Sequence, residues 1–155
     1  MRIIPTKDPV VTTALSGRGL RTTRARRVIL ETVRGTDAHP TAEWVFRKVR
    51  RRLPRVSLGT VYRNLRLLVR TGLLVERADA AGFRFDGNTS EHHHFTCVAC
   101  GRVYDLAEPI DGGLHRRVAS RTGFEVFRHR IEFYGRCAGC SSSPRGRRAP
   151  WQARA

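Results

Sequence analysis

The sequence contains four cysteines, which form two C-x-x-C pairs, Cys97 with Cys100 and Cys137 with Cys140, and none is left over. Two thiolates three positions apart can bind one tetrahedral ion from a single tight turn, as structural Zn²⁺ sites require. Disulfide pairing is one alternative, but the chain carries no secretory signal. Thioredoxin-like redox chemistry is another, but it needs one C-x-x-C at a strand-to-helix junction. The pattern therefore predicts a structural zinc site, because four thiolates leave no position open for a substrate.

Basic residues outnumber acidic residues, and the 30 Lys and Arg against 13 Asp and Glu give a formal net charge of +17. The surplus lies mainly in the N-terminal half, with +12 over residues 1–90 and +5 over residues 91–155. A balance of this kind indicates a polyanionic partner, most simply double-stranded DNA or another nucleic acid.

No stretch of the sequence approaches the roughly 20 apolar residues that span a bilayer. Pro5, Lys7, Asp8 and Pro9 interrupt the N-terminal segment, so it lacks the apolar run of a signal peptide. We therefore expect a soluble, cytoplasmic protein with no membrane partner, in which thiols stay reduced and available to a metal.

Three segments of the N-terminal half have the pattern of capped, amphipathic helices. Thr23, Thr41 and Ser57 are each suited to be an N-cap, and apolar residues repeat at helical spacing after each of them. Gly72 is suited to follow the end of the third helix. Two short strand-like runs, 73–77 and 83–85, then flank a turn and predict a hairpin.

Three helices followed by a small hairpin are typical of a winged helix-turn-helix, which places one helix in the DNA major groove. Helical bundles without a nucleic-acid function can have the same order of elements. The C-terminal half has strand-like runs at 95–97, 102–106 and 124–134 and a helical run at 109–122.

The expected fold class is α+β, with a DNA-binding domain followed by an α/β domain that holds the zinc. A domain of about 60 residues has a marginal core, so a structural metal is physically reasonable there. The expected segments are a loosely ordered arm over 1–16 with a short helix near 9–16, a winged-helix domain over 17–86, a linker over 87–91, a zinc-containing dimerisation domain over 92–140 and a disordered basic tail over 141–155.

Five other potential metal ligands form a second group: His39, Asp86, His92, His94 and Asp105. Imidazoles and carboxylates together suit Mn²⁺, Fe²⁺, Co²⁺, Ni²⁺ or Zn²⁺. His92 and His94 alternate along a strand, so both can point to one face while His93 points away. Taken singly, each also has an ordinary interpretation as a turn residue, a linker cap or a surface acid.

Several motifs resemble signatures of the ferric uptake regulator family. They are residues 38–43 (AHPTAE), 57–65 (SLGTVYRNL), 92–101 (HHHFTCVACG) and 134–137 (YGRC) followed by Cys140. Their ordered occurrence covers roughly residues 17–140, which makes the resemblance specific. It implies a metal-dependent, dimeric transcription repressor with an N-terminal winged helix and a C-terminal dimerisation domain.

Within the family, the resemblance implies a regulatory site of the peroxide-sensing type, which uses three histidines and two aspartates. Iron-uptake regulators usually carry glutamates in place of Asp86 and Asp105, and zinc-uptake regulators commonly use a cysteine, of which this chain has none spare. The resemblance thus implies a regulatory Fe²⁺ or Mn²⁺, with His39 and His92 as the residues oxidised by hydrogen peroxide. A third site, found in some members, would use Glu91, His93 and His129 and stays open here.

The helix that begins near Ser57 is expected to read DNA. Tyr62 and Arg63 lie in its N-terminal half, and the family resemblance points to them, although Tyr62 also suits a place in the domain core. The predicted DNA contacts are Arg21, Ser57, Thr60, Tyr62, Arg63 and Asn64.

The preferred function is a homodimeric, metal-activated repressor of genes for peroxide defence or metal homeostasis, and not an enzyme. An iron or manganese uptake regulator without peroxide sensing is the first alternative. A metallohydrolase would use an open position at the histidine and aspartate site, but the sequence offers no evident base or substrate pocket. A zinc-ribbon RNA-binding protein would explain the charge and the cysteines, yet it would leave the second ligand group unused.

Overall fold

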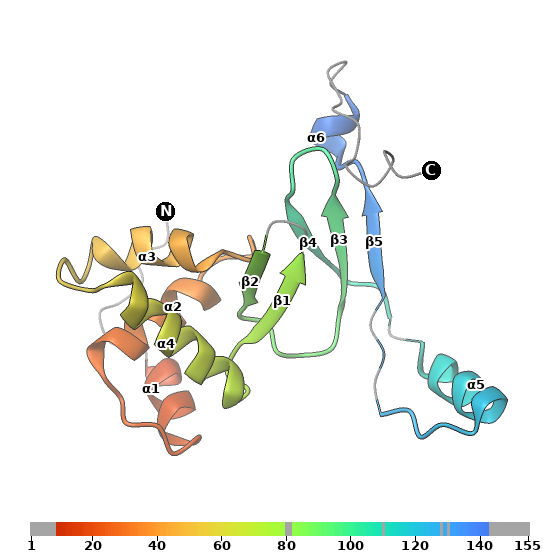
Figure 1. The fold of residues 1–155 in the computed structure, drawn as a ribbon, viewed down its shortest axis with the longest axis horizontal. Helices are drawn as coiled ribbons and strands as arrows, with labels where there is room; N and C mark the ends of the chain where they lie inside the picture. The colour runs from red at the N-terminus through yellow and green to blue at the C-terminus, as the bar shows by residue number, and fades with distance from the viewer. Residues whose placement is uncertain (1–8, 80–81, 110, 128, 130, 143–155) are drawn as a thin grey trace. The chain divides into compact units, whose positions relative to one another are not determined.

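The computed structural model describes residues 9–79, 82–109, 111–127, 129 and 131–142 (Figure 1). They form two compact units that meet in sequence between Thr89 and Ser90. Across these ranges no helix combines the length and the apolar character that crossing a bilayer requires.

The first unit contains four helices and one hairpin (Figure 1). Their bounds are α1 Pro9–Ser16, α2 Arg24–Arg34, α3 Ala42–Arg50, α4 Leu58–Arg70, β1 Val75–Asp79 and β2 Gly82–Asp86. The two strands pair antiparallel, from Val75 opposite Asp86 to Asp79 opposite Gly82. The order α2, α3, α4, β1, β2 confirms the winged helix-turn-helix that the sequence predicts.

The three helices of this motif begin where the N-cap pattern places them. The side-chain oxygens of Thr23, Thr41 and Ser57 accept hydrogen bonds from backbone N–H groups three residues ahead, at 3.2, 3.3 and 3.1 Å. Each bond satisfies one N–H that the first helical turn leaves without a partner, which is worth about 1 kcal/mol. At the far end of α4, Gly72 has a φ of 70°, which favours glycine.

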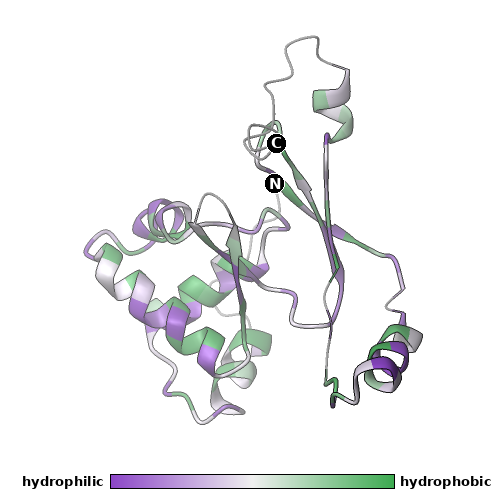
Figure 2. Ribbon diagram, turned by 45° about the vertical axis from the view of Figure 1, so that its right-hand side comes forward, coloured by the Kyte–Doolittle hydropathy of each residue, from purple (hydrophilic) through white to green (hydrophobic). Residues whose placement is uncertain are grey.

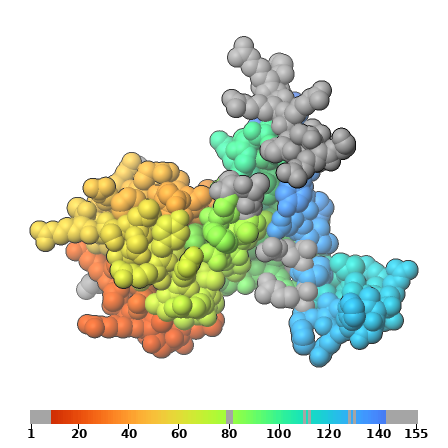
Figure 3. All heavy atoms as spheres, viewed as in Figure 1, coloured from red at the N-terminus to blue at the C-terminus, as the bar shows by residue number. Residues whose placement is uncertain are grey.

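The core of the first unit lies among α2, α3 and α4, which pack against one another. In the space-filling view, side chains close the gaps that the ribbon leaves between the helices of this unit (Figure 3). Figure 2 shows hydrophobic and hydrophilic residues sharing each of these helices, and the hydrophobic ones include buried residues from every helix and from the hairpin. The largest fully buried side chains include Ile29, Leu30, Leu65, Leu68 and Phe85. Amphipathic helices and one face of the wing therefore share a single core.

The N-terminal arm differs from expectation. The short helix near residues 9–16 is present as α1, but it is not loosely ordered, because Val11 and Leu15 are 3% and 0% exposed in the common core. Burying such side chains contributes roughly 1.5–3 kcal/mol each, which is enough to hold a two-turn helix in place. Residues 1–8 lie outside the described residues.

The second unit is built on a three-stranded sheet of order β4-β3-β5. Its elements are β3 His93–Cys97, β4 Val103–Leu106, α5 Gly112–Thr122, β5 Glu132–Gly135 and α6 Ala138–Ser141. β4 runs antiparallel to β3, and β5 runs parallel to it. The unit thus combines a small mixed sheet with two helices, as the predicted α/β class requires.

Two predicted elements of this unit are too long. The helix expected over 109–122 begins at Gly112, after Asp111, whose carboxylate accepts the N–H of Gly113 at 2.8 Å. Of the strand expected over 124–134, the described part is β5, which pairs with β3 from Glu132 opposite His94 to Gly135 opposite Cys97. Residues 124–127 lie outside any strand. Of the tail expected over 141–155, Ser141 ends α6, and residues 143–155 lie outside the described residues.

Candidate metal centres and DNA-reading helix

The sheet of the second unit brings the four cysteines together. Cys97 ends β3, and Cys100 lies in the turn that the N–H of Gly101 closes on the carbonyl of Cys97 at 2.8 Å. Cys137 precedes α6, and Cys140 lies within it, just after β5. The four sulfur atoms all lie within 4.8 Å of one another. The turn and the parallel pairing of β3 with β5 therefore assemble the cluster that the C-x-x-C pairs predict.

The electrostatics of this cluster favour metal binding. Burial raises the pKa of Cys97, but the N–H groups of Cys137, Cys100 and Ala99 point at its sulfur and lower that pKa to about 6. Hydrogen bonds with the sulfurs of Cys137 and Cys100 raise the pKa of Cys140 to about 12. None of the four cysteines is in a disulfide. Four sulfurs at this spacing fit a tetrahedral Zn²⁺, which displaces the thiol protons when it binds.

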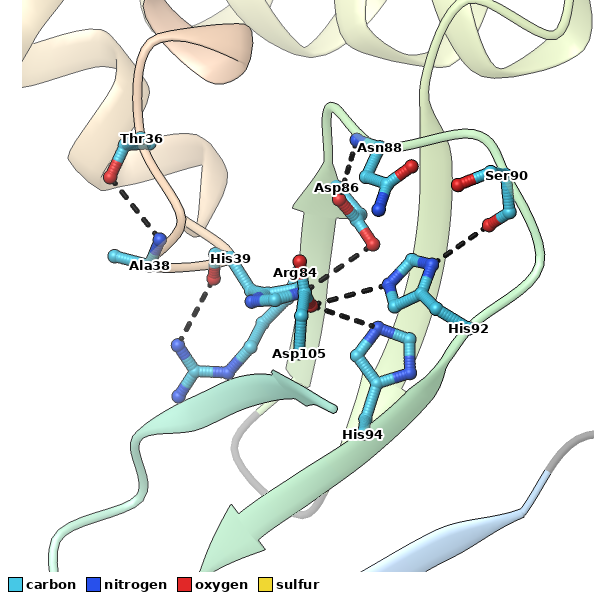
Figure 4. Close-up of polar contacts among 10 residues, drawn as sticks. All are labelled: Thr36, Ala38, His39, Arg84, Asp86, Asn88, Ser90, His92, His94 and Asp105. Carbon is cyan, nitrogen blue, oxygen red and sulfur yellow. Dashed lines mark hydrogen bonds and ion pairs between the residues drawn. The ribbon is translucent and has the colours of Figure 1, made fainter. Parts of the chain in front are cut away.

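His39 and Asp86 form a buried pair in the first unit (Figure 4). The Nε2 atom of His39 lies 3.3 Å from Oδ2 of Asp86, the last residue of β2, whose Oδ1 accepts the N–H of Asn88 at 2.7 Å. His39 is 2% exposed and has a φ of 45°, a left-handed conformation that is uncommon for any residue with a side chain. Arg84 donates to the His39 carbonyl at 3.3 Å and helps to hold this conformation. Backbone strain of this kind is concentrated at functional sites.

His92, His94 and Asp105 form a second cluster, in the second unit (Figure 4). His94 lies opposite Asp105 in the β3–β4 ladder, and Oδ1 of Asp105 lies 3.2 Å from Nε2 of His92 and 3.6 Å from Nε2 of His94. The Nδ1 atom of His92 lies 2.8 Å from the carbonyl of Ser90. A carbonyl can only accept, so Nδ1 of His92 carries a proton and Nε2 is the ring nitrogen that a metal could use.

His93 lies on the opposite face of β3, as the alternation of a strand requires. Its ring is 6.2 Å from that of Phe133 and 6.5 Å from that of His129. The ring of His129 in turn lies 4.5 Å from the ring of His115, a residue that the sequence pattern did not single out. Glu91, the other residue of the open third site, is exposed.

Among the predicted DNA contacts on α4, some side chains are exposed and others make hydrogen bonds within the first unit. Arg63 is exposed, and it donates to Oγ1 of Thr60 at 3.4 Å, in the same turn that Ser57 caps. Tyr62 is half-buried against the core, and its hydroxyl donates to Oε1 of Glu43 on α3 at 2.6 Å. This hydrogen bond lowers the pKa of Glu43 and raises the pKa of Tyr62. Arg63 is therefore the more available of the two for a base edge.

Asn64 uses its amide within the first unit. Its Nδ2 donates to the carbonyl of Thr60 at 2.8 Å, and its Oδ1 accepts from Nε of Arg26 at 3.3 Å. Arg26 also donates to the carbonyl of Arg21, so it connects the exposed Arg21 segment to α4. No sequence pattern singles out Arg26, because its side-chain partner Asn64 lies far from it along the chain.

The sequence pattern also does not indicate that one acidic residue is buried. Glu31 on α2 has a side chain that is 0% exposed, and its carboxylate lies 2.8 Å from Arg52 and 3.7 Å from Arg27. The spacing of four residues between Arg27 and Glu31 is a recognisable helical pair. The other partner, Arg52, lies after α3 and has no regular spacing from Glu31 that would indicate the pair.

These features define a winged-helix protein with a four-cysteine cluster consistent with a structural zinc site. The chain matches the ferric uptake regulator family over residues 17–134, and it belongs to that family. Family membership makes it a metal-dependent DNA-binding repressor.

Three similar proteins illustrate the relationship. The peroxide operon regulator of Bacillus subtilis is 40% identical over 124 residues, which are 79% of this chain and 86% of that protein. The peroxide-responsive repressor PerR of Staphylococcus aureus is 34% identical over 123 residues, 79% of this chain and 83% of that protein. Among solved structures, a zinc-bound manganese uptake regulator has a TM-score of 0.66 and 28% identity over 82% of this chain and 98% of its own.

Proposed function

We propose that this repressor senses hydrogen peroxide through a regulatory Fe²⁺, that Mn²⁺ can replace the iron, and that the repressor acts as a homodimer on a double-stranded DNA operator. The observation that carries the proposal is the donor set. Three histidines and two aspartates are held in two small clusters, His39 with Asp86 and His92 with His94 and Asp105. The names of the Bacillus and Staphylococcus relatives, which refer to peroxide, support the same conclusion.

The two clusters belong to different units of the chain, which gives the metal a way to control DNA binding. His39 and Asp86 lie before the boundary at Thr89, and His92, His94 and Asp105 lie after it. Ligands from both units, bound to one ion, restrict the units to one relative orientation. If that orientation is the one that binds the operator, the metal favours DNA binding because it binds more tightly to the protein in that orientation.

The ligand histidines are the proposed site of oxidation. The two clusters would hold Fe²⁺, which would activate hydrogen peroxide so that its O–O bond breaks, one oxygen replaces the hydrogen on a ligand imidazole carbon and the other leaves as water. The ring of His92 is hydrogen-bonded to the Ser90 carbonyl and the buried ring of His39 lies 3.3 Å from Asp86, so both rings are placed within their clusters. We expect His39 or His92 to gain one oxygen atom, which weakens it as a ligand and releases the DNA. The cysteines, bound to zinc, are not the primary sensor.

Peptide mass spectrometry of the iron-loaded and manganese-loaded protein, after a low dose of hydrogen peroxide, tests this function. We expect added oxygen at His39 or His92 in the iron form alone, together with loss of operator binding. His93 and His115 are internal controls, because they lie outside both clusters. Intact histidines and retained DNA binding in both forms would instead support an iron or manganese uptake regulator, the alternative that the manganese uptake regulator structure favours.

Exposed aromatic side chains on the second unit support the proposed homodimer. Phe124, Phe127, Phe133 and Tyr134 are 68%, 79%, 43% and 59% exposed. Large apolar side chains gathered on one unit indicate a protein partner, and a second copy of the chain is the partner we propose. Sedimentation equilibrium of the zinc-loaded protein measures the association directly.

A further inference from the structure

A basic cavity lies beside the N-terminal end of α4. Its volume is about 520 Å³, and it is bordered by the first residues of α2 and by the segment between α3 and α4. Its lining includes Arg24, Arg52, Leu53, Arg55, Val56 and Thr60. The cavity therefore combines three guanidinium groups with an apolar surface from Leu53 and Val56.

The charge of this cavity is positive and only partly neutralised. Arg52 forms an ion pair with the buried carboxylate of Glu31 at 2.8 Å, which fixes its position and offsets its charge. Arg24 and Arg55 are exposed, and no acidic residue is among the described residues that line the cavity. Arginine presents planar sets of N–H donors that match phosphate oxygens.

The cavity is connected to the residues expected to read bases. Thr60 lines the cavity, and the same Oγ1 atom accepts from Arg63 at 3.4 Å and lies 2.9 Å from Oγ of Ser57. Thr60 belongs to the first turn of α4, where the positive end of the helix dipole lies. A duplex read by Arg63 would therefore bring its sugar-phosphate backbone to the cavity.

We propose that the cavity receives one deoxyribose-phosphate unit of the operator backbone. In this arrangement the guanidinium groups of Arg24 and Arg55 bind the phosphate, and Leu53 and Val56 contact the sugar. A contact of this kind carries no sequence information and instead sets the register of α4 in the groove. The inference rests on the proposed function, because it names the part of the DNA that this unit holds.

The test uses manganese-loaded, full-length protein and a duplex obtained by in vitro selection against that protein. A scan in which single phosphates are replaced by neutral methylphosphonates should find a sensitive position in each half-site of the duplex for the wild type. Arg24→Ala and Arg55→Ala should each lower affinity roughly tenfold and abolish the sensitivity at that position. The slope of log affinity against log salt should fall by about 0.9 for each phosphate that the variant no longer binds.

Arg70→Ala is the matched control, because it removes the same charge from the last residue of α4, at the opposite end of that helix from Thr60. This variant should keep the methylphosphonate profile of the wild type. Equal profiles for Arg24→Ala, Arg55→Ala and Arg70→Ala would overturn the phosphate site while leaving the repressor function intact. A wild type that binds no duplex at all would instead contradict the proposed function.

Discussion

Asn64 illustrates how a residue that resembles a DNA contact can have an internal role. Its amide bridges the carbonyl of Thr60 and the guanidinium of Arg26, and Arg26 in turn holds the carbonyl of Arg21. Each of these partly buried hydrogen bonds contributes about 0.5–1.5 kcal/mol to the free energy of unfolding. The contribution of Asn64 to DNA binding is therefore expected to act through the placement of Arg21 and α4.

We predict that Asn64→Ala lowers the free energy of unfolding by about 1 kcal/mol and that a double-mutant cycle with Arg26→Ala shows coupling of similar size. Urea denaturation of the single and double variants measures both quantities. Arg63→Ala is the control: its side chain is exposed, so stability should change by less than about 0.5 kcal/mol. Operator affinity, in contrast, should fall by about 1–3 kcal/mol if Arg63 contacts a base edge. Strictly additive effects of Arg26→Ala and Asn64→Ala would refute the bridge.

At the scale of elements, the Tyr62–Glu43 hydrogen bond ties α4 to the first turn of α3. The pKa of Glu43 is lowered from 4.5 chiefly by this bond. A carboxylate whose pKa is lower in the folded state stabilises the fold above its ordinary pKa, and that contribution is lost as the pH falls through the folded pKa. The connection between the two helices of the DNA-binding motif should therefore weaken in acid.

We predict that Tyr62→Phe raises the pKa of Glu43 toward 4.5, because the donor that favours the ionised carboxylate is removed. An NMR titration of the Glu43 side chain measures this change. The stability difference between wild type and variant should be present at pH 7 and should disappear in acid. Glu43→Gln is the matched control, since it cannot ionise and should make the stability effect of Tyr62→Phe independent of pH. An unchanged Glu43 pKa in Tyr62→Phe would show that the bond is not formed in solution.

At the scale of the whole molecule, the two units depend on different sources of stability. The first unit has a continuous core drawn from α1, α2, α3, α4 and the hairpin. In the second unit the buried hydrophobic residues among those described are Cys97 and Val103. A unit with so little buried apolar surface needs another source of folding free energy, and a metal bound by four thiolates is a sufficient one.

We predict that Cys137→Ser releases zinc and unfolds the second unit while the first unit keeps its structure. Elemental analysis after EDTA treatment should find one resistant zinc per chain in the wild type and none in the variant. Limited proteolysis should then leave a fragment that ends near Thr89, the boundary between the units. Ser141→Ala, at the end of the short helix that follows Cys137, is the control and should retain the metal. A zinc-free Cys137→Ser protein with both units protected would contradict the structural role.

Features that depend on neighbours along the chain could be predicted from the sequence. Thr23, Thr41 and Ser57 cap helices because each bond spans three residues. His92 directly precedes β3, so it does not share a strand with His94 as predicted, yet both side chains still reach Asp105. The two C-x-x-C pairs likewise specify their own turns. Local spacing is sufficient in each case because backbone geometry fixes where those side chains lie.

Features whose partners are distant in sequence were set by the three-dimensional packing of the chain. The burial of α1, the length of β5 and the pairing of Glu31 with Arg52 each depend on which surface or strand another segment presents. The cavity of Arg24 and Arg55 has the same origin, because its walls come from α2, α4 and the segment that precedes α4. A side-chain pattern indicates which face of an element is buried, but the partner of that face is decided only when the elements pack together.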